Sequence, residues 1–308
     1  MFLERIAPMS LLVVGSIAFD SIETPDGSVD DALGGSASYF SVAASHFTKP
    51  RLVGVVGEDF PDEHRTLFNS RNIDTAGLVT KTGQTFRWKG RYHTDMNTRD
   101  TLEVHLNVFG EFKPELPEHF TDSSHIFLAN SSPSTQLATL AQIKSPKLVL
   151  ADTMDLWINI EKGPLLELLQ KVDGLLLNDS EAQLLTGEKN LVRAGKAVLA
   201  MGPKFIILKK GEHGAMLFSG DEVCVFPAFP TENVIDPTGA GDSFAGGILG
   251  YLASHDHDPI ASLQRAMAYG TVVASMTVEG FGLDRLRQAT RNEIDNRLVQ
   301  YRNMLQIG

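Results

Sequence analysis

Apolar and polar positions divide most of this chain into short β-type runs and longer helical stretches that alternate with one another. The apolar runs indicate strands at residues 11–17, 52–56, 125–129, 147–151, 174–177 and 205–208. Helical periodicity indicates helices at residues 36–46, 61–70, 135–143, 191–201, 240–253, 260–277 and 285–305. This alternation predicts an α/β fold with a three-layer, doubly wound, mostly parallel sheet.

Two segments, residues 21–33 and 85–109, break the alternation. The first is polar and rich in aspartate. In the second, apolar and polar residues alternate with a period of two, which predicts two antiparallel strands joined at residues 95–99. We expect both segments to form a small β-sheet that acts as a lid on a large domain of residues 1–20, 34–84 and 110–308. The alternative is a hairpin on the edge of the main sheet.

The predicted lid has faces of different chemistry. Arg87, Lys89 and Arg91 form a basic face, for which contact with solvent is the simplest interpretation. If that face closed over a site instead, it would suit a phosphorylated substrate. The second strand presents an aliphatic row that the small sheet cannot bury alone, which predicts a homodimer formed through the lids. The row consists of Leu102, Val104, Leu106 and Val108.

Composition narrows the classes of function. The 308 residues are 43% hydrophobic and 21% charged, which is enough apolar material for a large core. The net charge of −11 argues against a nucleic acid or an anionic membrane as a partner. No apolar run reaches the length of a membrane span, and the single cysteine, Cys224, excludes an internal disulfide. We therefore expect a cytoplasmic protein.

The clearest chemical signal is the stretch 236–247, which leads directly into an apolar helix and reads DPTGAGDSFAGG. Its small residues let the backbone approach a ligand closely, and the free amides at a helix start bind anions. Asp242 is predicted in the first helical turn beside these amides. A carboxylate there can take a proton from a hydroxyl while the amides hold a phosphoryl group. Taken alone, a helix cap is the alternative role for Asp242.

The stretch 236–247 closely resembles the C-terminal signature of the ribokinase-like family, also called the PfkB carbohydrate kinases. Segments 34–44, 54–60, 178–181 and 209–214 are similar to further family motifs and extend the resemblance from residue 9 to about residue 300. The resemblance implies a ribokinase-like fold. It also implies an ATP-dependent kinase that phosphorylates a hydroxyl of a sugar or sugar derivative.

The resemblance assigns roles to residues of the C-terminal signature. Asp242 matches the family's catalytic base, which deprotonates the acceptor hydroxyl. Asp236 matches a residue near a monovalent-cation site, which implies that potassium supports the reaction. The anion hole around the phosphates is matched by Gly239, Ala240 and Gly241.

The same resemblance implies a site for MgATP. Asn178 and Glu181 match the pair that orders magnesium, with Glu181 acting through water, and they also fit a helix start with a capping box. Lys209 replaces a small hydroxyl residue common in the family. A lysine there either contacts a phosphate as a point charge or lies in solvent at the end of a strand. The other residues implied at the nucleotide are Gly211, Gly214, Thr238, Ser275 and Gly282.

The substrate side matches the family less closely. Asp20 matches the acidic residue that binds sugar hydroxyls, and Gly34 and Gly35 match the glycines beneath the sugar. Tyr39 stands where the family usually has asparagine, and its ring would suit stacking on a substrate. Residues 152–157 also depart from the pattern of related fructokinases. A nucleoside kinase of the adenosine type therefore stays open beside a sugar kinase. The intact Asp242 and anion loop argue against a third class, a non-catalytic ligand-binding member of the fold.

Overall fold

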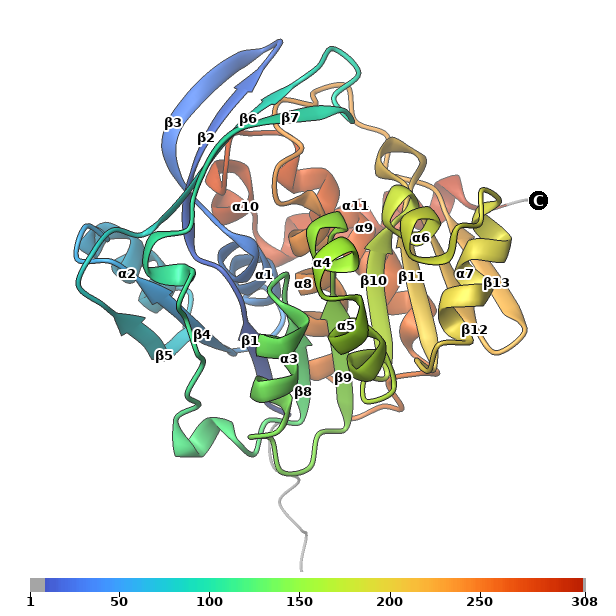
Figure 1. Ribbon diagram of the computed structural model, residues 1–308. Coiled ribbons are helices and arrows are strands. Elements are labelled where there is room, and N and C mark those ends of the chain that lie inside the picture. The colour runs from blue at the N-terminus through green and yellow to red at the C-terminus, as the bar shows by residue number, and fades with distance from the viewer. Residues whose placement is uncertain (1–8, 307–308) are drawn as a thin grey trace, which may run out of the picture.

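A computed structural model describes residues 9–306, and a nine-stranded sheet lies at its centre (Figure 1). Its order is β13-β12-β11-β10-β9-β8-β1-β4-β5. The pairs β11–β12 and β12–β13 are antiparallel and the other six pairs are parallel, so the predicted mostly parallel sheet is confirmed. The edge strand β5 and the strand β12, which lies between β11 and β13, were not predicted from the sequence. The strands are β1 (Leu11–Val14), β4 (Pro50–Val56), β5 (Asp74–Thr80), β8 (His125–Leu128), β9 (Leu148–Asp152), β10 (Gly174–Asn178), β11 (Phe205–Lys209), β12 (Ala215–Ser219) and β13 (Glu222–Phe226).

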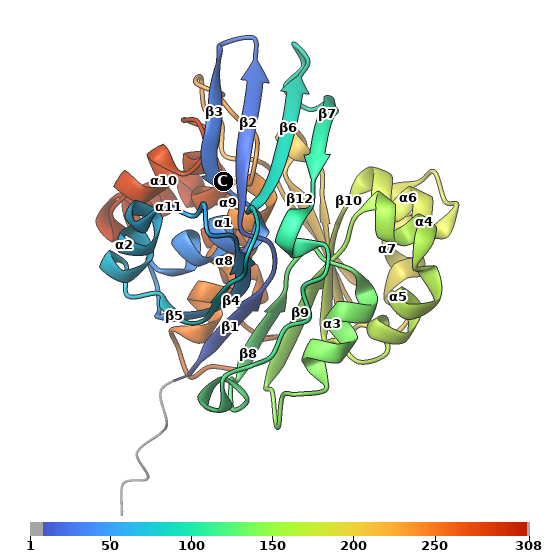
Figure 2. The same cartoon turned by 60° about the vertical axis from the view of Figure 1, so that its left-hand side comes forward.

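Helices cover both faces of this sheet, because its central strands are buried on both sides (Figure 2). In residues 9–306 no helix is both long and apolar enough to cross a membrane. One face is covered by α1 (Ser36–Ala44), α2 (Asp62–Ser70), α8 (Ala240–Ala253), α9 (Leu263–Thr277), α10 (Asp284–Gln288) and α11 (Arg291–Met304). The other face is covered by α3 (Pro133–Leu140), α4 (Asp155–Ile160), α5 (Lys162–Leu169), α6 (Asp179–Thr186) and α7 (Leu191–Leu199).

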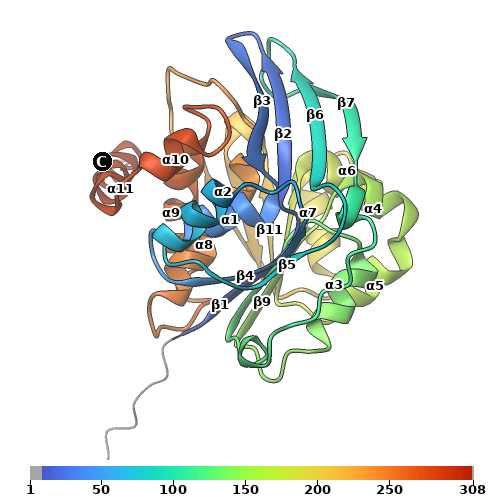
Figure 3. The ribbon, with the colours of Figure 1, turned by 90° about the vertical axis from the view of Figure 1, so that its left-hand side faces the viewer.

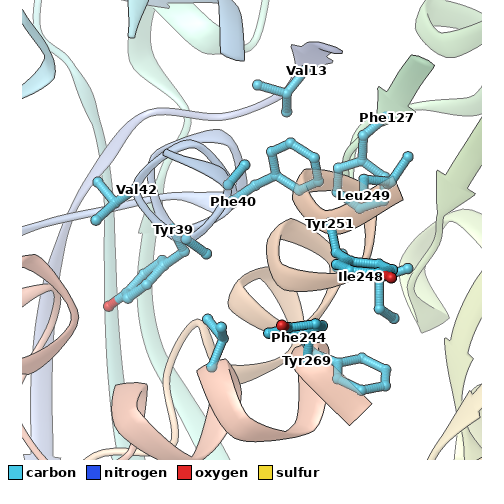
Figure 4. Packing of buried hydrophobic residues seen from close by; sticks show 14 of the residues in the cluster. Val13, Tyr39, Phe40, Val42, Phe127, Phe244, Ile248, Leu249, Tyr251 and Tyr269 are labelled. Atoms are coloured by element: carbon cyan, nitrogen blue, oxygen red, sulfur yellow. The ribbon is translucent and has the colours of Figure 1, made fainter. Parts of the chain in front are cut away.

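Helices α1 and α8 pack against each other in the larger of the two cores (Figure 4). Phe40 of α1 stacks on Phe127 of β8 with ring centroids 4.5 Å apart. Gly246 of α8 allows the close approach of the helices, since a Cβ there would lie 2.5 Å from the carbonyl oxygen of Phe40. This packing fixes the position of the α8 N-terminus against α1.

The predicted single helix at 285–305 is wrong, because the chain forms α10 and α11 with a break between them. Thr290 ends the connection and caps α11. Its hydroxyl accepts the amide of Glu293, and the Glu293 carboxylate accepts the amide of Thr290, a complete capping box. A Thr-x-x-Glu pattern marks such a start in the sequence.

A separate four-stranded sheet stands above one end of the main sheet (Figures 2 and 3). Its order is β3-β2-β6-β7, with β2 (Ala18–Thr24), β3 (Gly27–Gly34), β6 (Phe86–Tyr92) and β7 (Arg99–His105). We call it the small sheet. It contains the two segments that interrupt the sequence pattern. The predicted aliphatic row is shorter than expected, because β7 ends at His105 and residues 107–109 form a 3-10 turn that includes Val108.

Candidate active site

Charged side chains gather at the carboxyl ends of the central parallel strands, beneath the small sheet. Asp152 ends β9, Asn178 ends β10 and Lys209 ends β11. These three strands are neighbours, and the carboxyl ends of parallel strands form the usual ligand crevice of such sheets. The small sheet contributes Asp20, which is buried on β2.

The loop before α8 has the geometry of an anion site. Gly239 precedes the helix with a φ of 73°, which a residue with a Cβ rarely adopts. The aromatic ring of Tyr39 lies directly against it, since a Cβ on Gly239 would lie 2.3 Å from ring carbons. Ala240 and Gly241 follow as the first helical residues; the amide of Ala240 donates to the carbonyl oxygen of Pro237 at 3.2 Å, and the amide of Gly241 has no partner within the helix. The amides and the helix dipole together favour an anion at this point.

Asp242 lies in the first turn of α8, as the sequence predicts. Burial, together with the negative charge of Asp152, raises the pKa of its carboxyl to about 7. The positive charges of Lys209 and Arg99 oppose that rise. A carboxylate with a pKa near neutrality is suited to accept a proton from a substrate at physiological pH.

Lys209 is inside the site and not in solvent at the strand end. Its ammonium nitrogen lies 3.1 Å from Oδ1 of Asp152, and a Cβ on Gly241 would lie 3.4 Å from the same nitrogen. Burial disfavours its charge, but the carboxylates of Asp152, Glu181 and Asp242 outweigh burial and raise its pKa. A fixed cation therefore stands beside the anion loop.

Asn178 and Glu181 form the capping box that their spacing predicts. Oδ1 of Asn178 accepts the Glu181 amide at 2.8 Å, and Oε2 of Glu181 accepts the Asn178 amide at 2.6 Å. Burial raises the pKa of Glu181 to about 7, while Lys209 lowers it. Because the cap uses only Oε2, Oε1 stays available for a water of a hydrated magnesium ion. The capping and ion-ordering roles are thus compatible.

Asp236 connects the anion loop to the turn after α9. Its Oδ1 accepts the amide of Thr238 at 2.9 Å and its Oδ2 accepts the amide of Gly282 at 3.0 Å. The side chain is fully buried, and burial raises its pKa. Among residues 9–306 it forms no ion pair. A buried carboxylate without a cationic side chain fits a position near a bound monovalent cation.

Asp20 and the glycine pair fit tightly together. A Cβ on Gly34 would lie 1.9 Å from Oδ2 of Asp20, so only glycine leaves room for this carboxylate. Gly35 has a φ of 88°, and a Cβ there would lie 2.6 Å from the carbonyl oxygen of Ser16. Burial raises the pKa of Asp20 to about 7, and the Gly35 amide opposes the rise. The glycines therefore hold Asp20 in place.

Tyr39 does not offer an open ring for stacking on a substrate. Its side chain is only 1% exposed, with the ring against Gly239. Within residues 9–306 its hydroxyl is buried without a hydrogen-bond partner, and burial together with the charge of Asp20 raises its pKa well above the usual value. Tyr39 supports the anion loop from below.

The remaining residues that were predicted to contact the nucleotide divide into two groups. Gly211 and Gly214 have φ values of 53° and 82° and shape the turn after β11. Ser275, by contrast, lies inside α9, where its hydroxyl donates to Val272 and accepts from Arg297. Its hydroxyl is therefore occupied within the fold.

Three residues of the small sheet reach this region without any sequence signal. The hydroxyl of Tyr92 lies 3.2 Å from that of Thr238, at the entrance to the anion loop. The side-chain amide nitrogen of Asn97, in the connection between β6 and β7, lies 3.1 Å from Oε1 of Glu212, in the turn after β11. The third, Arg99, was predicted as part of a connecting turn, but it begins β7.

The basic face of the small sheet points away from the site. Arg87 pairs with Asp31 and Asp59, and its guanidinium covers the ring of Phe19. Lys89 and Arg91 both pair with Glu23. These neutralised, outward-facing cations do not fit the alternative in which this face binds a phosphorylated acceptor.

Known proteins resemble this chain over most of its length. The family model described as pfkB family carbohydrate kinase matches residues 9–288. The cytidine kinase of Thermococcus kodakarensis is 30% identical over 248 residues, which are 78% of this chain and 87% of that protein. The solved nucleoside kinase of Methanocaldococcus jannaschii has a TM-score of 0.75 at 21% identity, covering 95% of this chain and 99% of its own. An Escherichia coli protein solved with ATP and Mg²⁺ has a TM-score of 0.76 at 19% identity, with the same coverage.

Proposed function

This chain belongs to the pfkB family of carbohydrate kinases, and on that premise we propose that it transfers the γ-phosphoryl group of ATP to a hydroxyl of a sugar or sugar derivative. The observation that carries the proposal is the position of Asp242 beside the anion loop. It combines a carboxylate of pKa about 7 with helix-start amides in one turn of chain. Phosphoryl transfer needs this pair, a base for the acceptor and positive dipoles for the phosphates.

In the proposed reaction, Asp242 accepts the proton of the acceptor hydroxyl as its oxygen attacks the γ-phosphorus. The bond from that phosphorus to the bridging oxygen of ATP breaks, and ADP leaves. The amides of Gly239, Ala240 and Gly241 stabilise the negative charge that spreads over the transferring group. Lys209 stands beside Gly241 and contributes a second fixed positive charge. Catalysis then rests on positioning and electrostatics, as is general for this reaction class.

Two ions are part of the proposal. Magnesium would be held near Asn178 and Glu181, partly through water, where it neutralises phosphate charge. A potassium ion would lie near Asp236, whose buried carboxylate fits a cation. The chain's own contribution is structural at both points. Asn178 and Glu181 fix the start of α6, and Asp236 fixes the loop to Gly282.

We propose that the acceptor binds between Asp20 and Asp242 and that the small sheet acts as its lid. Two contacts, Tyr92 with Thr238 and Asn97 with Glu212, support a closed arrangement. Closure would keep water away from the phosphoryl group and so limit hydrolysis of ATP. Asp20, buried against Gly34, would accept hydrogen bonds from acceptor hydroxyls.

A nucleoside is the second candidate acceptor. The cytidine kinase relative supports it. Trp88 supports it too, because it stands opposite Asp20 on the inner face of the small sheet, where its ring could contact the base of a nucleoside. The buried Tyr39 no longer supports it, because its ring is closed to ligands. We further propose a cytoplasmic location, where ATP is supplied, and a homodimer through the small sheets.

A substrate panel tests the function. Purified protein with MgATP would be given pentoses, hexoses, their phosphates and nucleosides, and ADP release would be compared with phosphorylated product by mass spectrometry. We expect acceptor-dependent ADP release with one class of compound. Absence of product across the whole panel, in a protein that binds ATP, would contradict the proposal.

A further inference from the structure

One cation of the small sheet differs from all the others. Arg87, Lys89 and Arg91 point outward and pair with carboxylates. Arg99 points inward, because it stands directly opposite Tyr92 in the β6–β7 pairing and so shares the face of Tyr92. Within residues 9–306, Arg99 forms no ion pair. An inner-face cation that pairs with no carboxylate of the described residues is a candidate for binding a ligand.

The inner face provides a surface that holds Arg99. The ring of Trp88 folds over Gly90, since a Cβ on Gly90 would lie 2.1 Å from the ring. Its indole nitrogen lies 3.4 Å from the hydroxyl of Thr101. The guanidinium carbon of Arg99 lies 5.8 Å from the Trp88 ring centroid, in the range of a cation–π contact. Gly90 and Trp88 together orient the arginine.

Two contacts bring this part of the small sheet to the phosphate side of the site. Tyr92, opposite Arg99, contacts Thr238 just before the anion loop. Asn97, two residues before Arg99, contacts Glu212 and lies against Gly211, where a Cβ would be 2.5 Å from its side-chain oxygen. Arg99 is held between these contacts, so its position depends on closure of the small sheet over the anion loop.

The electrostatics agree with this position. Burial dominates the pKa of both Asp20 and Asp242 and raises it, while the charge of Arg99 lowers the pKa of each. The charge of Arg99 therefore acts on both carboxylates, although within residues 9–306 it pairs with neither. In the proposed reaction the attacking hydroxyl lies between these two carboxylates.

We propose that Arg99 is a catalytic residue which the small sheet delivers to the transferring phosphoryl group, where its guanidinium binds a phosphoryl oxygen in the transition state. The inference rests on the proposed function and adds a residue to it. Guanidinium binds phosphate oxygens with directed, charge-assisted hydrogen bonds, and a cation at this point offsets developing negative charge. Binding of an anionic acceptor is less favoured, because Asp20 and Asp242 make the acceptor side negative.

The test compares Arg99→Met with Arg91→Met, using the acceptor identified in the substrate panel. Arg91 is the matched control, a neighbouring arginine on the outer face paired with Glu23. We expect Arg99→Met to lower kcat by about 100-fold or more with smaller changes in KM, as for loss of one transition-state donor. Arg91→Met should stay within about twofold of wild type, as for an exposed ion pair. Arg99→Ala should recover activity when guanidinium ion is added at non-denaturing concentration.

The outcomes separate cleanly. A large fall in kcat with rescue by guanidinium supports the proposal, because a lost structural contact is not restored by a free ion. A kcat close to wild type overturns it, as does a fall without rescue or a change confined to KM for the acceptor. A wild-type protein without kinase activity would refute the proposed function itself. The effect of replacing Arg99 is measured only relative to an active wild type. Failure of the Arg99 proposal is therefore distinguishable from failure of the proposed function.

Discussion

The ammonium nitrogen of Lys209 lies 3.1 Å from Oδ1 and 3.3 Å from Oδ2 of Asp152, across the end of the intervening strand β10. Both side chains are largely buried, so this ion pair is poorly screened by solvent. Lys209 also faces Glu181 and Asp242, so one cation balances three carboxylates before any ligand binds. When phosphates enter, the same cation is already beside the anion loop.

Replacing Lys209 is therefore expected to lower the catalytic efficiency with MgATP. Lys209→Met should lower kcat/KM for MgATP by roughly 10- to 100-fold, the range for one charge-assisted hydrogen bond. Initial rates at varied MgATP would measure the change. Lys210→Met is the matched control, because Lys210 is adjacent in sequence and forms no ion pair within the described residues. Equal kinetics for the two variants would argue against a phosphate role for Lys209.

Activity should depend on pH through Asp242. The base works only when deprotonated, so kcat/KM for the acceptor should fall as pH drops below about 7 and level off above it. Initial rates across a pH series at saturating MgATP would show this fall, which is the acidic limb of the pH profile. Since Asp20 also has a pKa of about 7, Asp20→Asn would separate its contribution. A rate that stays constant from pH 8 to pH 5 would contradict the assignment of Asp242.

Neighbouring charges should move this limb in opposite directions. After burial, Asp152 is the largest cause that raises the pKa of Asp242, so Asp152→Asn should move the limb to lower pH. Lys209 lowers that pKa, so Lys209→Met should move the limb to higher pH. Arg99 also acts on Asp242 and lowers its pKa. Shifts of the same sign in both variants would show that the limb belongs to another group.

Potassium should raise the rate at fixed magnesium. Asp236 is a buried carboxylate without an ion pair in the described part of the chain, which fits a neighbouring monovalent cation. Rates in potassium chloride and in tetramethylammonium chloride of equal ionic strength would be compared. Identical rates would remove the cation site from the account but leave the kinase assignment intact.

The small sheet gives a prediction about assembly. Val104 in β7 and Leu106 just after it are 51% and 47% exposed, so apolar side chains in and next to β7 are open to a partner. Sedimentation at micromolar concentration should show a dimer, and Val104→Lys or Leu106→Lys should shift it to monomer. A monomeric wild type would exclude the lid-mediated dimer.

The parts of the site that were predicted from the sequence are local. Gly239, Ala240, Gly241 and Asp242 are contiguous, so their geometry follows from one loop and one helix start. The capping box of Asn178 and Glu181 is likewise contained in four residues. Short-range backbone rules are sufficient for such features.

What the sequence did not reveal depends on long-range packing. Asp152 and Lys209 come together because β9 and β11 lie on either side of the single strand β10, so that their carboxyl ends are close in space. Tyr39 is closed to ligands because its ring packs on Gly239, 200 positions later in the chain. Arg99 faces the site because a register shift between Lys89 and Gly90 places it opposite Tyr92. Strand order and register are set by the whole fold and are not written in any one segment.

The central claim is that Asp242 is the base of a phosphotransferase, and Asp242→Asn tests it most directly. Asparagine is nearly isosteric and removes a carboxylate whose charge is disfavoured by burial, so the fold should persist. The measurement is turnover of the identified acceptor at pH 8, with MgATP affinity determined by calorimetry on the same samples. We predict that turnover is abolished while ATP binds nearly as in wild type. A variant that binds ATP and keeps more than a small fraction of wild-type turnover would contradict the account.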